Sequence, residues 1–524
     1  MYESLINFIR SLVYVPDEGM VHAGLPPGWV LLVIAVMLMM IIVNRAAYAT
    51  TRTDTGSKSY MPIAGEYIKP LVTTPWLLLS IRIIVASIFL LVIYAGLFGT
   101  PIPERNLATV LTWTIWWSGV VISVFFVGSA WCAICPWDAI ASWLVRRKLW
   151  QRGSEASSLN LRVPKMFRSI WPALLMFIGL TWLELGVGVT VSPYATALMA
   201  LLMVVLATVS LAVYERKAFC RYFCAVGRTI GAYSSMSPVA LRPVDQNICA
   251  DCKTLECYHG NDSIEPCPTH LVMGRITQNT YCTSCGACSQ SCPQQNVSWQ
   301  LRGVGDEVTY ASRPHWDEAW FILGLVALTT FHGFTMMPYW EGWMQQLAYT
   351  IGDSGKLLVS FSIGMFVSML IPISLFSLST YITKRIAFDR EHFQRVFSSL
   401  VICTIPLAFS YHIAHNLTHL FRESQGFWSV VANPLGINAL PLSMQELHMR
   451  HMNPLVADDI VFALQGMLLM FGFWLAIRIA KQRIVQLGLL ATGNKMALLP
   501  MTVFISVITL LNLWLLMQPM IMRM

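Results

Sequence analysis

The cysteines between residues 249 and 292 form the pattern with the most definite chemistry in the chain. Residues 282–293 read CTSCGACSQSCP, which spaces three thiols by two residues each and places a fourth before a proline. Three thiolates at this spacing bind three corners of a [4Fe-4S] cube, whereas the fourth is carried away by the proline turn to a second cube. A structural zinc site needs neither the third thiol nor the trailing Cys-Pro. The pattern therefore predicts two iron–sulfur clusters.

A looser set of cysteines lies upstream and completes the ligands. Cys249, Cys252 and Cys257 are followed by Cys267, which again precedes a proline. Pairing the two motifs gives two sets of four thiolates with no cysteine left over. We expect cluster 1 on Cys249, Cys252, Cys257 and Cys292, and cluster 2 on Cys282, Cys285, Cys288 and Cys267.

The composition indicates the membrane that surrounds these thiols. The 524 residues are 56% hydrophobic and 12% charged, whereas soluble domains have about 25% charged residues. This balance excludes a water-soluble enzyme, a disordered chain and a secreted disulfide scaffold. The net charge of +8 does not indicate nucleic acid, because basic residues mark the cytoplasmic loops of membrane proteins.

Apolar stretches of suitable length recur along the chain. A bilayer core about 30 Å thick needs roughly 20 apolar residues per helix, and about ten stretches qualify. They are 28–46, 76–99, 108–131, 168–188, 193–215, 316–338, 356–383, 396–420, 459–479 and 496–517. Lys and Arg gather in alternate loops, which by the positive-inside rule face the cytoplasm. We therefore expect a multi-pass protein of a prokaryotic cytoplasmic (inner) membrane with both termini outside.

The predicted fold is an all-α polytopic membrane protein into which a small α+β domain with two [4Fe-4S] clusters is inserted. Residues 1–215 form an amino-terminal membrane domain of five helices, with a C-x2-C-P motif at 132–136. Residues 216–315 form the cytoplasmic cluster domain. Residues 316–524 form a carboxy-terminal membrane domain of five helices that includes a His-rich helix at 396–420.

Two further cysteine pairs precede the cluster motifs. Cys132 and Cys135 follow the third predicted helix, and Cys220 and Cys224 follow the fifth. The topology places all four thiols at the cytoplasmic surface beside the cluster domain. Thiols that converge in this way bind a metal or form a redox-active dithiol, whereas isolated cysteines are often ordinary buried residues. The sequence does not choose between a metal and a dithiol.

The combination of these motifs resembles a known group of proteins. The segment with CTSCGACSQSCP looks like a bacterial two-[4Fe-4S] ferredoxin, and with both cysteine pairs the chain resembles the NapH/NosR/CcoG group of membrane polyferredoxins. That group has C-x3-C-P pairs at the cytoplasmic ends of helices. Here the first pair is one residue shorter, and Ala225 stands where the second proline is expected. The resemblance covers about 76–300 and implies a role near anaerobic respiration or copper-oxidase maturation.

Four histidines are predicted to lie inside the membrane. His412, His415 and His419 share one face of a helix, with Asn416 beside them, and His332 lies at a similar depth in another helix. Intramembrane histidines are costly unless they are paired, and they often mark function. Four interpretations stay open: ligation of haem b, a quinone pocket, another metal, and hydrogen bonds between helices.

A second group of soft ligands lies on the predicted outer face. Met444, His448, Met449 and His451 fall within the stretch MQELHMRHM. Thioether and imidazole ligands suit copper, particularly Cu(I). Met is also an ordinary apolar residue, and the 28 methionines are spread along the whole chain. The stretch is the best evidence in the sequence for copper handling.

These patterns predict a membrane-bound iron–sulfur protein that moves electrons between a cytoplasmic or quinone-linked donor and a respiratory or metal-centre acceptor. It would act as the electron-transfer subunit of an oxidoreductase system, with no catalytic residues of its own. The expected partners are the lipid bilayer, a soluble ferredoxin or iron–sulfur subunit, and the quinone pool. The alternatives are a copper reductase or assembly factor for a copper respiratory enzyme, and a redox-sensing membrane regulator.

Overall fold

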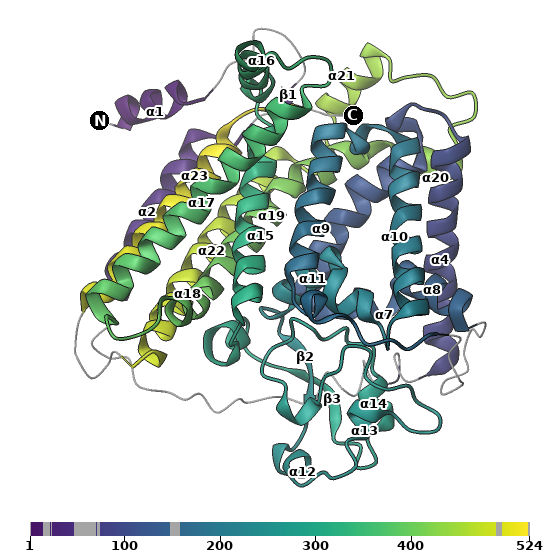
Figure 1. The fold of residues 1–524 in the computed structure, drawn as a ribbon. Helices are drawn as coiled ribbons and strands as arrows, with labels where there is room; N and C mark the ends of the chain where they lie inside the picture. Colours follow the sequence, from purple (N-terminus) through teal and green to yellow (C-terminus); the bar gives the residue numbers. More distant parts are fainter. Residues whose placement is uncertain are drawn as a thin grey trace.

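The computed structural model describes residues 2–13, 21–22, 24–46, 70, 74–146, 158–488 and 495–521. This part of the chain is mostly helical, with two sheets of two short strands each. The long helices run side by side, and the cysteine-rich segment forms a lobe at one end of them (Figure 1). Helix α1 and the end of the chain lie at the opposite end.

The amino-terminal half contains α1 (Tyr2–Ser11), β1 (Val21–His22), α2 (Pro27–Ala46), α4 (Pro75–Phe98), α5 (Leu107–Thr109), α6 (Trp117–Val127), α7 (Trp131–Ile134), α8 (Pro136–Arg146), α9 (Trp171–Trp182) and α10 (Pro193–Val213). Short 3-10 and π-helical segments lie between them: η2 (Pro103–Arg105), η3 (Val110–Trp116), η4 (Gly128–Ala130), η5 (Lys165–Phe167), η6 (Leu183–Val187) and η7 (Val189–Val191).

The middle of the chain contains η8 (Phe219–Phe223), α11 (Ala225–Ser234), β2 (Val239–Pro243), α12 (Gln246–Ala250), α13 (Glu256–His259), η9 (Met273–Arg275), α14 (Ala287–Ser291), β3 (Val297–Leu301) and η10 (Glu307–Ala311).

The carboxy-terminal half contains α15 (Trp316–Thr335), α16 (Tyr339–Ile351), α17 (Leu358–Ala387), α18 (Phe393–Leu400), η11 (Val401–Cys403), α19 (Thr404–Glu423), η12 (Ser424–Gly426), α20 (Phe427–Ala432), α21 (Met444–Met452), α22 (Asp458–Gln486), η14 (Lys495–Leu498), α23 (Leu499–Met517) and β4 (Met520–Ile521).

Nine helical stretches of the described residues are long and apolar enough to cross a membrane, and each overlaps a predicted span. The remaining prediction, 168–188, corresponds to a shorter apolar helix, Trp171–Val187. Gly188 ends this helix in the left-handed conformation, with a φ of 81°, and Pro193 begins α10 shortly afterwards. The chain is therefore a multi-pass membrane protein by the length and composition of its helices.

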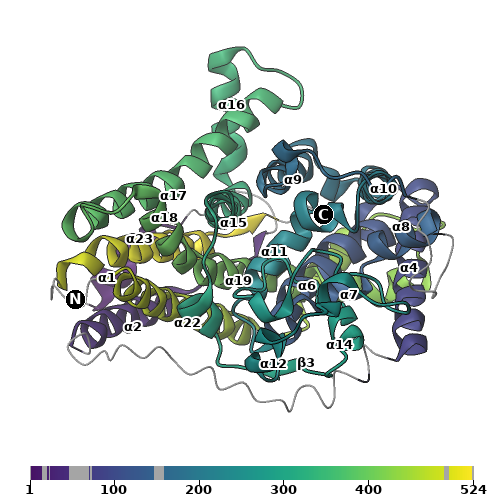
Figure 2. The ribbon, with the colours of Figure 1, turned by 60° about the horizontal axis from the view of Figure 1, so that its bottom comes forward.

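The most buried helices lie at the centre of the bundle. Helices α15 and α19 are almost wholly covered, because α19 packs against α22, α15 and α6. In contrast, α2, α4 and α17 expose many large apolar side chains, as expected of helices that face lipid. Figure 2 shows α19 and α15 surrounded by the other long helices. Buried polar residues on α19 are therefore shielded from lipid by protein.

The segment 216–315 has two parts in space. Helix α11 is almost entirely buried and packs against α6, α9 and α19, within the helical bundle. Strands β2 and β3 then pair in antiparallel register, with Val239 opposite Leu301 and Leu241 opposite Trp299. The segments with the cluster cysteines lie around this sheet (Figure 1). The buried core around the sheet is small, as expected for a segment of this length.

A buried ion network attaches this lobe to the bundle. Glu307 accepts hydrogen bonds from Arg242 and Arg302, and also from the backbone N–H of Asn279. Arg302 also donates to the carbonyl oxygen of Ser234, at the end of α11. The network therefore connects the sheet, the loop before the second cysteine motif and α11.

Candidate electron-transfer site

The second cysteine motif is the more buried of the two. Cys267, Cys282 and Cys288 are buried, and Cys285 is partly exposed. Burial raises the pKa of Cys282 to about 11, and it raises the pKa of Cys288 well above its usual value. A buried thiol with a raised pKa remains protonated unless a cation compensates the thiolate. Without a bound cation, Cys282 and Cys288 are therefore neutral thiols at neutral pH.

Electrostatic contacts connect thiols within each predicted ligand set, and one contact also connects the two sets. Cys288 interacts electrostatically with the three other thiols of its predicted set, Cys285, Cys282 and Cys267, and also with Cys257 of the first set. In the first predicted set, Cys257 interacts electrostatically with the three other thiols, which are Cys249, Cys252 and Cys292.

Backbone and amide N–H groups point at several of these sulfurs. The N–H of Leu271 donates to Cys267 Sγ at 3.3 Å. Asn296 donates from its backbone to Cys292 Sγ and from its side chain to Cys249 Sγ, both at 3.4 Å. Such donors stabilise negative charge on cluster sulfurs and tune reduction potentials. They suit thiolate ligands better than neutral thiols.

The loop conformation also suits a short wrapped motif. Ser284 and Gly286, within CTSCGAC, both adopt positive φ, at 48° and 76°, which turns the backbone tightly.

Among the described residues, however, no three His, Cys, Asp or Glu side chains are grouped closely enough to hold a single metal ion. The two cluster ligand sets therefore remain predictions.

A third group of thiols lies where the lobe meets the helices. Cys135, Cys220 and Cys224 line one small cavity of about 30 Å³ together with Asp138 and Lys217, which form an ion pair at 2.5 Å. The two cysteine pairs, distant in sequence, thus meet at one place. Their role as a metal or dithiol site remains a prediction.

Cys132 lies near both this group and predicted cluster set 2. Its electrostatic partners include Cys224 and Cys282. The buried Arg228 of α11 lies nearby and donates to the carbonyl oxygens of Cys220 and Thr280, at 2.8 and 2.6 Å. This guanidinium fixes the helical cysteines against the loop that precedes the second cluster motif.

Arg82 positions the first pair from another helix. This residue lies within α4, and its Nε donates to the carbonyl oxygen of Ala133 at 2.8 Å. Ala133 lies between Cys132 and Cys135. The hydrogen bond therefore holds the turn on which both thiols are carried.

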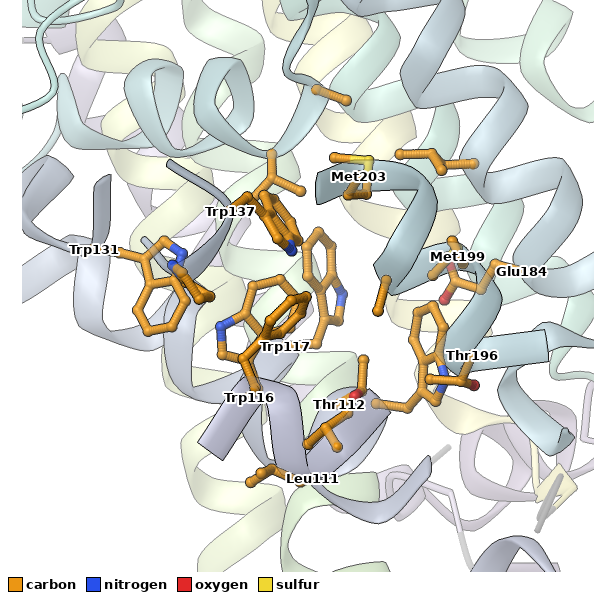
Figure 3. A pocket seen from close by; sticks show the side chains of 18 of the residues that line it. Leu111, Thr112, Trp116, Trp117, Trp131, Trp137, Glu184, Thr196, Met199 and Met203 are labelled. Carbon is orange, nitrogen blue, oxygen red and sulfur yellow. The ribbon is translucent and has the colours of Figure 1, made fainter. Parts of the chain in front are cut away.

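A large apolar cavity lies directly beside the third thiol group. Its volume is about 280 Å³, and the elements that contribute to its wall are α4, η3, α6, α7, α8, α9, η6, α10 and α11. Figure 3 shows the indole rings of Trp116, Trp117, Trp131 and Trp137 on one side, with Glu184 across the cavity. Trp137 lines both this cavity and the thiol cavity.

The four intramembrane histidines lie close together. The ring centroids of His332 and His415 are 5.0 Å apart, and those of His415 and His419 are 5.2 Å apart. His412 Nδ1 lies 3.2 Å from the hydroxyl of Tyr233 on α11, and His419 Nδ1 lies 2.6 Å from Glu423. The row therefore runs along α19 from α11 towards a carboxylate near the end of the helix.

A small cavity of about 30 Å³ lies beside this row and is lined by His332, His412 and His415. Asn416, also predicted to belong there, lines it too, and so does Glu184, which the large cavity shares. Neither ring nitrogen of His415 has a hydrogen-bond partner among the described residues. A volume of this size is large enough for about two waters. Binding of haem, quinone or a metal by these histidines remains a prediction.

The predicted copper ligands lie elsewhere. His448 belongs to α21, a short amphipathic helix, and is exposed, as are Met444 and Met449. The side chain of His451 lies outside the described residues. Within the described part of the chain, these residues do not meet the thiol group or the histidine row.

Sequence reasoning did not find the tryptophan cavity, or the positioning roles of Arg82, Arg228 and Tyr233. The cavity wall comes from helices that are far apart in the chain, so no local motif marks it. The arginines did carry a signal, because a charge within or next to an apolar helix must find a partner.

Comparison with known proteins supports the general function. The chain is 30% identical over 82 residues to a protein of Escherichia coli (strain K12) described as "Putative electron transport protein YccM". The match covers 15% of this chain and 20% of that protein, so the chain spans about a fifth of its relative's length in the match. No family model matches, and no solved structure matches either. The likeness to an electron transport protein and the apolar helices together fit membrane electron transfer.

Proposed function

We propose that this protein is a membrane-bound iron–sulfur electron-transfer protein of a prokaryotic cytoplasmic membrane. The observation that carries the proposal is the cysteine spacing of residues 249–292 in one lobe, where N–H groups donate to the sulfurs of Cys267, Cys292 and Cys249. When bound, two [4Fe-4S] clusters supply one-electron chemistry over a wide range of potentials.

The residues of this chain perform the positioning. The β2–β3 sheet and the short helices hold the loops of both cysteine sets in one lobe. The Glu307 network and Arg228 fix that lobe against α11. Electron transfer needs a fixed, short separation between sites, so these buried contacts serve the function directly.

The third thiol group adjoins both the lobe and the helical bundle. Cys132 lies near both Cys282 and Cys224, and Trp137 separates the thiol cavity from the tryptophan cavity. We assign Cys132, Cys135, Cys220 and Cys224 to a third redox or metal centre between the lobe and the bundle.

The lobe faces the cytoplasm in this proposal, because the flanking loops are rich in Lys and Arg. A soluble ferredoxin or iron–sulfur subunit would exchange electrons with cluster 1, whose Cys249, Cys252 and Cys257 are partly exposed. Partly exposed ligands allow a partner to approach the cluster closely.

A set of single serine variants tests the proposal, with iron counted in protein purified anaerobically. Cys292→Ser should lose the cluster of the first set, and Cys282→Ser the cluster of the second, each with a loss of about half of the iron. Cys403→Ser is the matched control, because Cys403 is buried like Cys282 but lies in η11, outside the three groups. Equal iron in all variants would contradict the ligand assignment.

A further inference from the structure

The tryptophan cavity combines an apolar wall with hydrogen-bond donors that have no acceptor. The indole Nε1 atoms of Trp116, Trp131 and Trp137 are buried and have no partner among the described residues. The hydroxyl of Thr229 is also buried without a hydrogen-bond partner among the described residues. All four residues line the cavity. Buried donors without a partner cost free energy, so a ligand that accepts from them is stabilised there.

One wall of the cavity is formed by α4, a helix that exposes many large apolar side chains. Ile88 of α4 lines the cavity and is 45% exposed, and Phe89 lines it next to Ile88. A membrane-soluble ligand therefore has a short path from the bilayer. The volume of about 280 Å³ lies near the lower end of small-molecule sites, which have about 300–1,000 Å³.

The neighbours of the cavity define the chemistry of the ligand. Its cytoplasmic wall includes Pro136 and Trp137, which follow Cys135 in the chain, and Ala225, which follows Cys224. The opposite wall includes Glu184, which also lines the histidine cavity with His412. The cavity therefore lies between the predicted thiol centre and the histidine row.

We propose that the tryptophan cavity binds the ring of an isoprenoid quinone, whose carbonyl oxygens accept from indole N–H groups and the Thr229 hydroxyl, and whose tail leaves past Ile88 into the bilayer. This inference rests on the proposed function, because it names the membrane-soluble substrate that would supply electrons to the predicted clusters. It moves the quinone from the histidine row, where the sequence suggested it, to the neighbouring cavity.

Each electron and proton released by the quinol has an acceptor among the groups named above. Oxidation of one quinol to quinone releases two electrons and two protons. The eight predicted ligand cysteines would hold two clusters, and each cluster would take up one electron and pass it to the soluble iron–sulfur partner. One proton goes to the Glu184 carboxylate, and the other goes to the imidazole of His412 across the shared wall. Glu184 and the histidine row thus lead protons away from the thiols, along α19.

Binding of menadione to the purified full-length protein in detergent tests the proposal. Trp137→Phe keeps the ring but removes the N–H, and it should raise the Kd about 2- to 12-fold, the range for one neutral hydrogen bond. Thr229→Val tests a second donor in case the Trp137 variant fails to fold. Trp343→Phe is the control, because Trp343 lies exposed on α16.

An unchanged Kd in both cavity variants would overturn the proposal, and so would equal loss of binding in the control. Displacement of menadione by a phospholipid, with no effect of either variant, would show an acyl-chain pocket instead and would also overturn it. The iron–sulfur absorption of the same samples separates the two proposals. Binding that fails in protein with intact clusters refutes only the quinone site, whereas protein without clusters refutes the proposed function.

Glu184→Gln adds a second readout. We expect the variant to bind menadione but to slow reduction of the clusters by menadiol about a hundredfold or more, since a positioned proton acceptor contributes that much. Unchanged reduction kinetics would show that protons leave the cavity by another path.

Discussion

Glu307 offers the sharpest test of how the cysteine lobe is held. Its side chain is only 1% exposed and neutralises two guanidinium groups, those of Arg242 and Arg302, which are 6% and 3% exposed. In Glu307→Gln the shape remains but two buried positive charges lose their counterion. Removal of one partner from a buried ion pair typically costs about 3–5 kcal/mol. We expect the free energy of opening of the lobe to fall by that amount.

Limited proteolysis measures this opening. If the lobe opens and closes rapidly, a loss of 3–5 kcal/mol speeds cleavage within 239–301 on the order of a hundred- to several-thousand-fold. Asp389→Asn is the control, because Asp389 is 68% exposed and pairs with the exposed Arg385, and such pairs contribute about 1 kcal/mol or less. Equal cleavage rates in the two variants would refute the role of the Glu307 network.

Two further changes probe the same region. Gly231→Ala should loosen the lobe and lower its iron content, because a Cβ at Gly231 would overlap the backbone carbonyl of Thr280. Gly119→Ala is the control and should leave the iron content unchanged, because the space around Gly119 is open. Equal iron content in the two variants would contradict the close packing at Gly231. Burial and the nearby Arg216 lower the pKa of His270 to about 4. The folded protein therefore keeps this imidazole neutral while the unfolded chain protonates near pH 6.5, so stability falls between about pH 6.5 and 4. His270→Asn should flatten that part of the urea-midpoint profile, and an unchanged slope would contradict the assignment.

The long helices could be predicted from the sequence because apolar length is a local property. Every predicted span corresponds to an apolar helix, although the fourth is shorter than a full span because Gly188 and Pro193 end one helix and begin the next. The assignment of the cysteines to two ligand sets rests on the same kind of local spacing and stays a prediction. The meeting of Cys135 with Cys220 and Cys224 at one cavity needed only the prediction that two helix ends meet.

Other features depend on contacts between distant segments. Helix α11 reads AVGRTIGAYS, which is too short and too polar to predict as part of a membrane bundle. It is buried because Arg228 finds backbone carbonyl partners and Tyr233 finds His412. The tryptophan cavity similarly has no sequence signature, because its lining residues come from Val85 to Thr229 along the chain.

The alignment of the histidines on one helical face follows from their spacing alone. Their environment does not, because the partners of the row come from other helices, as with Tyr233 from α11 and His332 from α15. A sequence pattern can therefore place these side chains together, whereas only the packing shows that Glu184 links them to the tryptophan cavity.

The central claim is that eight thiolates of one lobe hold two iron cubes, and metal and sulfide analysis with EPR spectroscopy tests it most directly. Protein purified without oxygen should contain about eight iron and eight acid-labile sulfides per chain. Reduction with dithionite should give the EPR signals of two interacting [4Fe-4S] clusters. Zinc in place of iron, or no EPR signal from fully reduced protein, would contradict the account.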